Sequence, residues 1–501
     1  MIEALTAHSV MASAVPATDA PRQSARIKPA QRHYDAAQTT RHNTNHWAHA
    51  ATEDANSLIG VSLATLRNRA RYEVRNNPYA KGILETLADD IVGESGPRLQ
   101  IESKNPEFNK SIEREFRDWS DGCDIGGRMS MGDLLRLSVF QFGESGESVT
   151  IKRDTAEGFR LLSVEPDVLT SPAGLALDNV TQGIKTDSDG RPVSYCILKE
   201  HPGKSHNLSA MTEYTDVPAA NVYHCFRVDR PGQFRGVPWL TPALPLFAQL
   251  RRYTAAVITA AETAADLSAV VLSNSEDLSP VAVKELDEFE IQRNTMLTLP
   301  VGWDMKQFKA EHPTTTFPEF VRQILMEIAR CVCMPVNVAM CDSSKHNFAS
   351  GRLDWKVYYR HIRTLRGWLE RSFLNPIFRD WLKFERLTLA GSTEKSIGAI
   401  LPRWFWPGQE PTDPLKAAQA SSLLIEKKMQ TLSEYKAEQG RDWEEDEDQL
   451  AREAEKRKVW FTELQEPITH EAPQAKTEES DPPDDDDDAT DADASDAGND
   501  A

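Results

Sequence analysis

The chain has 501 residues, enough for a large buried core and for two to four domains. Hydrophobic residues make up 40% and charged residues 27%, so most of the chain is expected to fold, with polar segments at its ends. Of the formal net charge of −20, 12 negative charges lie between 478 and 501, which leaves −8 for the remainder. A mildly acidic body argues against tight wrapping by DNA, although not against DNA that slides past it.

Several protein classes are unsupported. No run of 18 apolar residues predicts a membrane span, and no secretory signal precedes the six cysteines, which are expected to be reduced, cytosolic thiols. The phosphate-binding and dinucleotide-binding glycine motifs are missing, as are the serine-hydrolase elbow and the H-E-x-x-H zinc motif. We therefore expect no enzyme, no cofactor and no ATP-driven motor.

Residues 1–58 show little periodicity and are predicted to form an extended or disordered arm. A helix is expected from Ser62, with Arg67, Arg69, Arg71 and Arg75 on its surface. Pro78 should separate it from a second helix that ends at Gly93.

The next part of the chain mixes both kinds of element. Apolar spacing predicts helices over 106–119 and 131–142 and strands over 147–153 and 159–164. Asp187–Gly190 has the composition of a hairpin turn before an alternating strand. The predicted fold class is α+β.

A helix of about 31 residues is predicted over Pro242–Leu272, a rod of roughly 46 Å. It is rich in alanine, and small side chains permit close approach of helices. On this pattern alone, a buried core helix is the simpler interpretation.

The remaining elements alternate between apolar and polar segments. Strand-like runs lie at 296–299 and 305–308, a helix is expected over 317–331, and a polar loop over 336–351. A long helix over 352–373 and a hydrophobic segment complete the body. A linker at 407–414 and charged helices over 415–464 precede the acidic tail, which is expected to be disordered.

Cys331 and Cys333, with Cys341 and His346, have the wrong spacing for the usual zinc pairs, so we expect buried structural thiols and no metal.

Five segments, in order, resemble the lambda-type family of phage portal proteins. They are His33-Tyr34-Asp35-Ala36-Ala37 with Trp47, Leu66–Arg71 with Arg75–Ala80 and Ile91–Gly93, Glu165-Pro166-Asp167, Gly183-Ile184 with Asp189–Val193, and Arg230–Leu240. Together they cover roughly residues 30–465, and the last is the most specific.

The resemblance implies a dodecameric ring at one capsid vertex, with double-stranded DNA passing through its channel. It implies terminase, major capsid, scaffolding and head-completion or connector proteins as partners, assembly in the host cytoplasm, and no membrane. The implied regions are an arm (1–58), wing (59–241), first stem helix (242–274), clip (275–316), second stem helix (317–335), tunnel loop (336–351), long helix and remaining wing (352–411), crown (412–465) and acidic tail (466–501).

Within that plan two sets of residues are candidates. Lys345, His346 and Asn347 would lie near DNA in the tunnel loop, with an ordinary surface loop as the alternative. Ala256, Ala260 and Ala264 would pack the first stem helix against neighbouring subunits. Another ring-forming head-completion protein and, less favoured, a phage DNA-processing enzyme remain as other functions.

Overall fold

The computed structural model describes residues 41, 44–48, 50, 52–102, 105–172, 179–204, 212–265, 269–273, 303–307, 316–388, 400–408 and 413–464. Met1–Asp54 and Ala55–Ala501 form two separate units, and residues 44–48 of the first unit form turns. The motif at 33–37 and the acidic tail lie outside the described residues. All elements below belong to the second unit.

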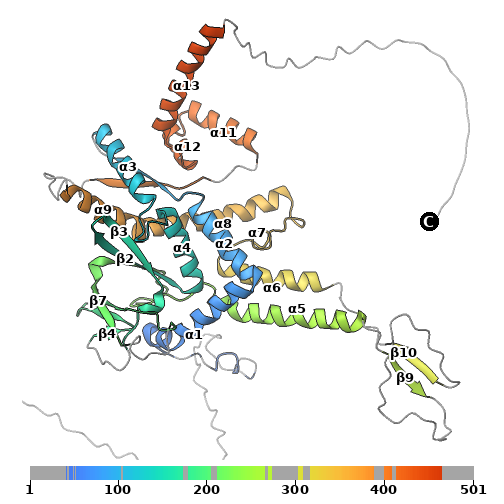
Figure 1. Ribbon diagram of the computed structural model, residues 1–501. Helices are drawn as coiled ribbons and strands as arrows, with labels where there is room; N and C mark the ends of the chain where they lie inside the picture. Colours follow the sequence, from blue (N-terminus) through green and yellow to red (C-terminus); the bar gives the residue numbers. More distant parts are fainter. Residues whose placement is uncertain are drawn as a thin grey trace, which may run out of the picture. The chain divides into compact units, whose positions relative to one another are not determined.

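Two helices begin this unit, α1 (Ala55–Asn76) and α2 (Pro78–Val92) (Figure 1). Asn77 caps α2 by accepting a hydrogen bond from the Tyr79 amide at 3.1 Å, and Gly93 ends it with φ 74°, as predicted. The first helix starts at Ala55 rather than Ser62, inside the segment expected to be an arm. Burial of Ala55 and Ile59 accounts for this early start.

The central helix of the core is α2, because it packs against α1, α4, α7 and α8. Four of its side chains, those of Ile83, Leu84, Leu87 and Ile91, have no exposed surface. Removing so much apolar surface from water is the main stabilisation of this part of the fold. The other helices near it are α3 (Pro106–Ser120) and α4 (Met131–Glu144), close to their predicted bounds.

The named strands pair antiparallel in four small sheets. One sheet has the order β3-β2-β8 (Gly158–Val164, Glu147–Thr155, Val222–Phe226), and another β4-β5-β6-β7 (Val180–Thr181, Ile184–Thr186, Pro192–Leu198, Tyr214–Pro218). The turn predicted at 187–190 joins β5 and β6, and the Asp187 carboxylate accepts hydrogen bonds from the amides of Asp189 and Arg191. The α+β class is confirmed.

After the short turn η5 (Thr241–Ala243), α5 spans Leu244–Ala265, so the helix predicted to Leu272 was too long. Strand β9 (Ala269–Ser273) replaces its end and pairs with β10 (Trp303–Gln307), near the strand expected at 305–308. Val270 and Val271 are β-branched and fit a paired strand better than a helix. The expected strand at 296–299 lies outside the described residues.

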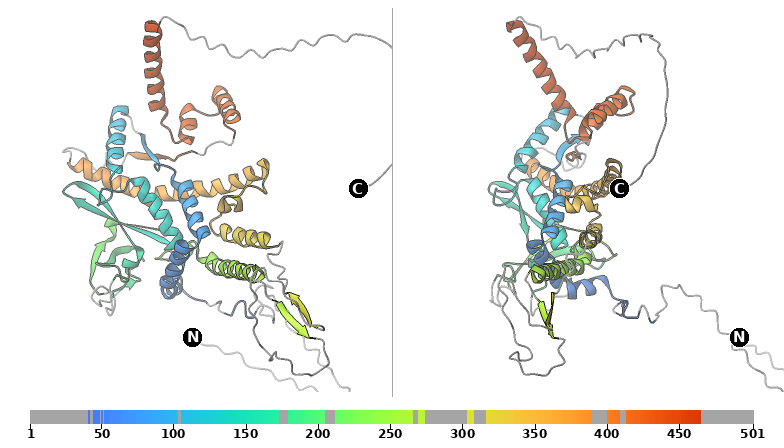
Figure 2. Two further views of the ribbon diagram at one scale, coloured as in Figure 1. Left: turned by 45° about the vertical axis from the view of Figure 1, so that its right-hand side comes forward. Right: turned by 90° about the vertical axis from the view of Figure 1, so that its right-hand side faces the viewer.

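Helix α6 (Phe317–Cys331) has the predicted bounds and runs beside α5 (Figures 1 and 2). The ring of Tyr253 on α5 stacks on Phe317, with centroids 5.6 Å apart, and contacts Phe320 edge-on at 4.6 Å. Aromatic pairs at such separations contribute beyond their buried area. They fasten the middle of α5 to the start of α6.

The polar loop expected over 336–351 is shorter than predicted. A short helix, α7 (Val336–Met340), takes its beginning, and α8 (Phe348–Leu369) starts four residues before Arg352. Burial of Ala339 packs α7 against the core. A capping box formed by Asn347 and Ser350 stabilises the first turn of α8. The loop between the two helices is therefore Cys341–Asn347.

The long helix continues beyond its predicted end. A π-helical turn, η6 (Glu370–Leu374), joins α8 to α9 (Asn375–Thr388). Phe378 and Trp381 of α9 pack around Phe116 of α3, with centroids 5.6 and 5.0 Å from it. Trp404 of β11 (Leu401–Phe405) completes this cluster, and β11 pairs with β1 (Arg98–Glu102).

The predicted charged helices are α11 (Pro414–Glu426), α12 (Leu432–Glu438) and α13 (Trp443–Leu464). Exposed ion pairs join α13 to α3: Arg117 lies 2.8 Å from Glu445, and Lys110 lies 3.3 Å from Glu444. In α11, which the structure describes throughout, no side chain is buried. Among the described residues, no helix combines the length and apolarity that a membrane crossing requires.

Candidate functional site

The loop Cys341–Asn347 is a compact turn, held by hydrogen bonds within the loop and to α7. Cys341 has a left-handed backbone with φ 51°, and its amide bonds back to the carbonyls at the end of α7. The Asp342 carboxylate accepts a hydrogen bond from the Ser344 amide at 2.9 Å, and the His346 amide donates to the Ser343 carbonyl at 3.0 Å. These bonds fix the backbone that presents the three candidate DNA-proximal residues.

Those three residues have different surroundings. Lys345 is exposed, and His346 is mostly covered, with its Nε2 atom 3.7 Å from an Asp354 oxygen. Asn347 caps α8, because its side-chain oxygen accepts from the Ser350 amide at 2.8 Å. The loop therefore offers one exposed cation, while Asn347 has a structural task that the sequence pattern did not predict.

The candidate alanines on α5 lie beyond the part of the helix that packs into the core. Leu244, Phe247 and Leu250, near its start, are buried. Further along, Ala256 is exposed and Ala260 is half-buried, while the side chain of Ala264 is outside the described ones. The simpler interpretation of a buried core helix therefore fails for this half of α5.

A buried charge cluster lies where segments distant in the sequence meet. Glu147, at the start of β2, has no exposed surface. Its carboxylate accepts from Arg235 at 2.5 and 2.8 Å, from Arg67 at 2.6 Å and from the Gly236 amide at 2.7 Å. His224 Nε2 lies 3.1 Å away. We call Glu147, Arg67, Arg235 and His224 the Glu147 cluster.

The electrostatics of the Glu147 cluster favour the ionised carboxylate. Burial alone would raise the pKa of Glu147, but the charges of Arg235, Arg67 and His224 hold this pKa well below its ordinary value. Arg67 was expected on the surface of α1, and this expectation was wrong: the side chain is 4% exposed and bonded to Glu147. Arg71 is also partly buried, paired with Asp167.

The cluster joins three of the segments that carry the family resemblance. Arg67 comes from the 66–71 segment, and Arg235 from the 230–240 segment. Both donate to the carbonyl of Pro166 in the Glu165-Pro166-Asp167 segment, at 3.3 and 3.0 Å. These motifs therefore hold the α1 helix, the sheets and the 230–240 segment together.

A close backbone approach explains one glycine of the same segment. A Cβ atom on Gly236 would lie 2.1 Å from the Gly146 carbonyl oxygen, and Gly146 itself has φ 88°. Backbone atoms cannot yield as a flexible side chain can. Glycine at 236 thus allows the 230–240 segment to reach Glu147.

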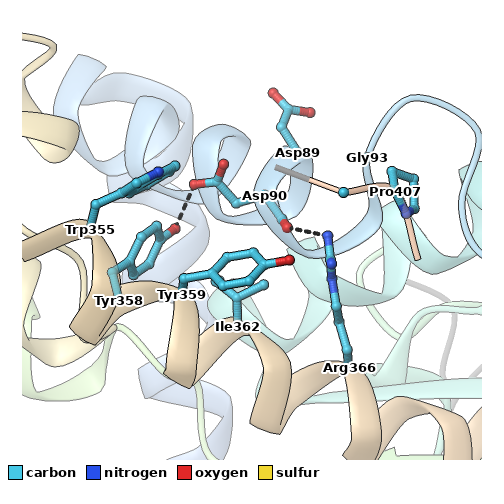
Figure 3. A pocket seen from close by; sticks show the side chains of 10 residues that line it. Asp89, Asp90, Gly93, Trp355, Tyr358, Tyr359, Ile362, Arg366 and Pro407 are labelled. Carbon is cyan, nitrogen blue, oxygen red and sulfur yellow. Dashed lines mark hydrogen bonds between the residues drawn. The ribbon is translucent and has the colours of Figure 1, made fainter. Parts of the chain in front are cut away.

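A second set of buried polar contacts lies at the end of α2, where it packs against α8 (Figure 3). Arg366 donates to the carbonyls of Ile91 and Asp90 at 2.8 and 2.9 Å, and the Tyr358 hydroxyl donates to the Asp90 carboxylate at 2.8 Å. A cation at the carbonyl end of a helix is favourable. Burial raises the pKa of Asp90 more than Tyr358 and Arg366 lower it. The cavity at this contact has a volume of about 230 Å³, and the residues that line it include those that hydrogen-bond α2 to α8.

The cysteines form no metal site among the described residues. Cys331 and Cys333 are half-buried and Cys341 is exposed, so the expectation of buried thiols was wrong for Cys341 and only partly right for the others. The Cys331 sulfur donates to the Trp239 carbonyl at 2.8 Å, which ties α6 to the 230–240 segment.

Glu147, His224 and Arg366 were not predicted from the sequence. A lone glutamate at the start of an apolar strand was the one available signal for Glu147. Nothing in the spacing of α8 distinguishes the buried Arg366 from the exposed bases of the same helix.

Comparison with known proteins gives a consistent result. A family described as phage portal protein, lambda family, matches residues 40–366. The chain is 27% identical over 462 residues to a probable portal protein of Halomonas phage phiHAP-1, covering 84% of this chain and 86% of that protein.

Distant structural likenesses accompany this match. The virion of a native gene transfer agent particle contains a chain with TM-score 0.46 and 15% identity, covering 78% of this chain and 94% of that one. A portal protein of the HK97 family from Corynebacterium diphtheriae has TM-score 0.32 and 11% identity, covering 70% and 97%. On the family match over residues 40–366, the chain belongs to the lambda family of phage portal proteins, which are structural components of the virion and not enzymes.

Proposed function

We propose that the chain is one subunit of a homo-oligomeric ring at one capsid vertex, assembled in the host cytoplasm, and that double-stranded DNA passes through its channel during packaging and ejection. Twelve subunits are proposed, with terminase, major capsid, scaffolding and head-completion or connector proteins as partners. Segment 275–316, most of it outside the described residues, is proposed as the clip that meets terminase.

The main support for the proposed ring is the second half of α5, which is exposed in a single subunit. Ala256 is exposed and Ala260, four residues further along the same face of the helix, is half-buried in a single subunit. An apolar helix face with small side chains favours close packing against another helix. We propose that Ala256, Ala260 and Ala264 make this contact with the neighbouring subunit.

Native mass spectrometry tests the ring. We expect an assembly close to twelve times the 56.1 kDa of one chain. Ala256→Trp should lower the fraction of ring without changing the unfolding of the subunit, whereas Glu262→Gln, an exposed change on the same helix, should leave assembly intact. A wild-type chain found only as monomers and dimers under assembly conditions would contradict the proposal.

The proposed role of the Cys341–Asn347 loop in contacting DNA rests on Lys345, because Lys345 is the exposed cationic residue of this loop. We propose that Lys345 and His346, with Asn347, lie beside the passing duplex and contact phosphates briefly. Lys345→Ala should change DNA packaging or retention in particles while rings form normally. Unchanged packaging and retention would remove the loop from the proposed channel.

A further inference from the structure

Helix α8 carries a row of four basic side chains on one face: Arg352, Lys356, Arg360 and Arg363. They follow one another at steps of four, four and three residues. At 3.6 residues per turn these steps keep all four within about 80° around the helix axis. We call these four residues the α8 basic row.

The α8 basic row is exposed and unbalanced. All four residues are exposed, and none has an acidic partner within ion-pair distance in the part of the chain that the structure describes. The one acidic residue of α8, Asp354, lies about 160° around the axis from the middle of the row and near His346. Some exposed bases elsewhere are paired with acids, as Arg117 and Lys110 of α3 are with Glu445 and Glu444 of α13.

Folding of the subunit does not explain the row. The side of α8 that packs into the core carries Tyr358, Ile362, Leu365 and Leu369, all buried. Like charges three or four residues apart on a helix destabilise it by about 0.2–0.5 kcal/mol per pair. The body of the chain is also acidic overall, so four neighbouring bases with no acid among them differ in charge from the rest of the chain. An external anion would offset this repulsion.

The geometry points to a regular polyanion. The row extends over 11 residue steps, which is about 16 Å at 1.5 Å per residue. Over that length one strand of a DNA duplex presents about five phosphates, at 3.4 Å per phosphate along the axis. The row also begins a few residues after Lys345, and it continues the same sign of charge along the helix.

We propose that the α8 basic row is a phosphate-contacting surface for double-stranded DNA. The inference deepens the proposed function and rests on it, because it names the helix face that would meet the DNA. The contacts would be reversible, since long exposed side chains with no fixed partner hold a phosphate weakly. A surface of this kind steadies a duplex without stopping it from sliding.

The experiment compares two variants that change charge equally. In the first, Arg352, Lys356, Arg360 and Arg363 are all changed to glutamine. In the matched control, four exposed bases outside α8 are changed to glutamine: Arg153, Lys185, Arg191 and Lys204. Binding of the full chain to a labelled duplex is measured by fluorescence anisotropy over a series of salt concentrations.

We expect the row variant to bind the duplex at least tenfold more weakly at low salt, with the control within about twofold of wild type. The slope of log affinity against log salt should become shallower by about 0.9 for each phosphate that the variant no longer neutralises. A third variant, with Arg352→Lys, Arg360→Lys and Arg363→Lys, keeps the charge and should bind nearly as wild type. Thermal unfolding of each variant is measured to check that it is folded.

Equal losses of affinity in the row variant and the control would overturn the inference, because they would show an effect of net charge alone. Loss of ring assembly in the row variant, with DNA affinity unchanged, would also overturn it and assign the row to an acidic neighbouring subunit. A wild-type chain that forms no ring, but whose row variant still loses DNA affinity, would overturn the ring proposal and leave this inference standing.

Discussion

Arg235 donates hydrogen bonds from Nε and Nη2 to the same oxygen of Glu147, at 2.8 and 2.5 Å, and neither side chain has more than 3% of its surface exposed. Both charges have been removed from water, so each depends on the other. Removal of one partner from a buried pair costs about 3–5 kcal/mol. Arg235→Met should therefore lower the free energy of unfolding by about that amount, measured by urea denaturation.

Lys199 supplies the comparison for this pair. Its ion pair with Glu213 is exposed on both sides, and such pairs contribute roughly 0–1 kcal/mol. Lys199→Met should thus shift the urea midpoint little. Similar shifts for the two variants would mean that the Glu147 cluster does not hold the fold together.

Gly236→Ala tests the close approach between the 230–240 segment and the turn before β2. The new Cβ would meet the Gly146 carbonyl oxygen at 2.1 Å, and backbone must move to relieve it. We expect a loss of several kcal/mol, seen as a large drop in thermal stability or as insoluble protein. Gly82→Ala is the matched control, because its Cβ meets nothing within 4 Å and alanine favours the helix. A stable Gly236→Ala variant would contradict the packing argument.

Local signals predicted those elements whose boundaries depend on a few neighbouring residues. Pro78 and Gly93 delimit α2, and Phe317 begins α6 where apolar spacing placed it. The end of α5 was missed because Ala269–Leu272 suits either an apolar helix or a strand, and pairing with β10 decides between them. Pairing is a property of distant segments and leaves no local mark.

The same limit applies to the candidate site. The exposure of Lys345 follows from its polar surroundings, whereas the burial of Arg67 depends on Glu147, which is 80 residues away. Arg67 and Arg69 look alike in the sequence. Only the fold shows that one of them reaches a buried carboxylate while the other remains exposed.

Glu113 should make the contact between α3 and α13 depend on pH. The pKa of Glu113 is raised to about 7, mainly by burial and also by the negative charges of Asp442, Glu445 and Glu444, while the hydrogen bond from the Ile101 amide opposes the rise. In the unfolded chain the pKa returns to the ordinary 4.5. The folded state therefore binds the extra proton, and stability falls as pH rises from 4.5 through 7.

Glu113→Gln should remove this slope and should be more stable than wild type above pH 7, because the amide oxygen still accepts from Ile101 without adding negative charge. Urea midpoints and hydrogen exchange of α13, taken across neutral pH, provide the measurement. The Glu115→Gln variant changes a half-buried neighbour, which accepts a hydrogen bond from Ser111 on the same helix, and should keep the wild-type slope. A persisting slope in Glu113→Gln would assign the titration to another group.

Asn347 allows the cap of α8 to be separated from any contact with DNA. Asn347→Ala removes the acceptor for the Ser350 amide and should cost about 1 kcal/mol of stability. Asn347→Asp keeps that acceptor, so stability should remain near wild type, but it places a negative charge beside Lys345. If the loop lies next to DNA, the aspartate variant should weaken duplex binding at low salt more than the alanine variant does, and added salt should reduce the difference. If the duplex affinities of the two variants follow their stabilities, with the alanine variant the weaker binder, Asn347 caps α8 and has no role in DNA binding.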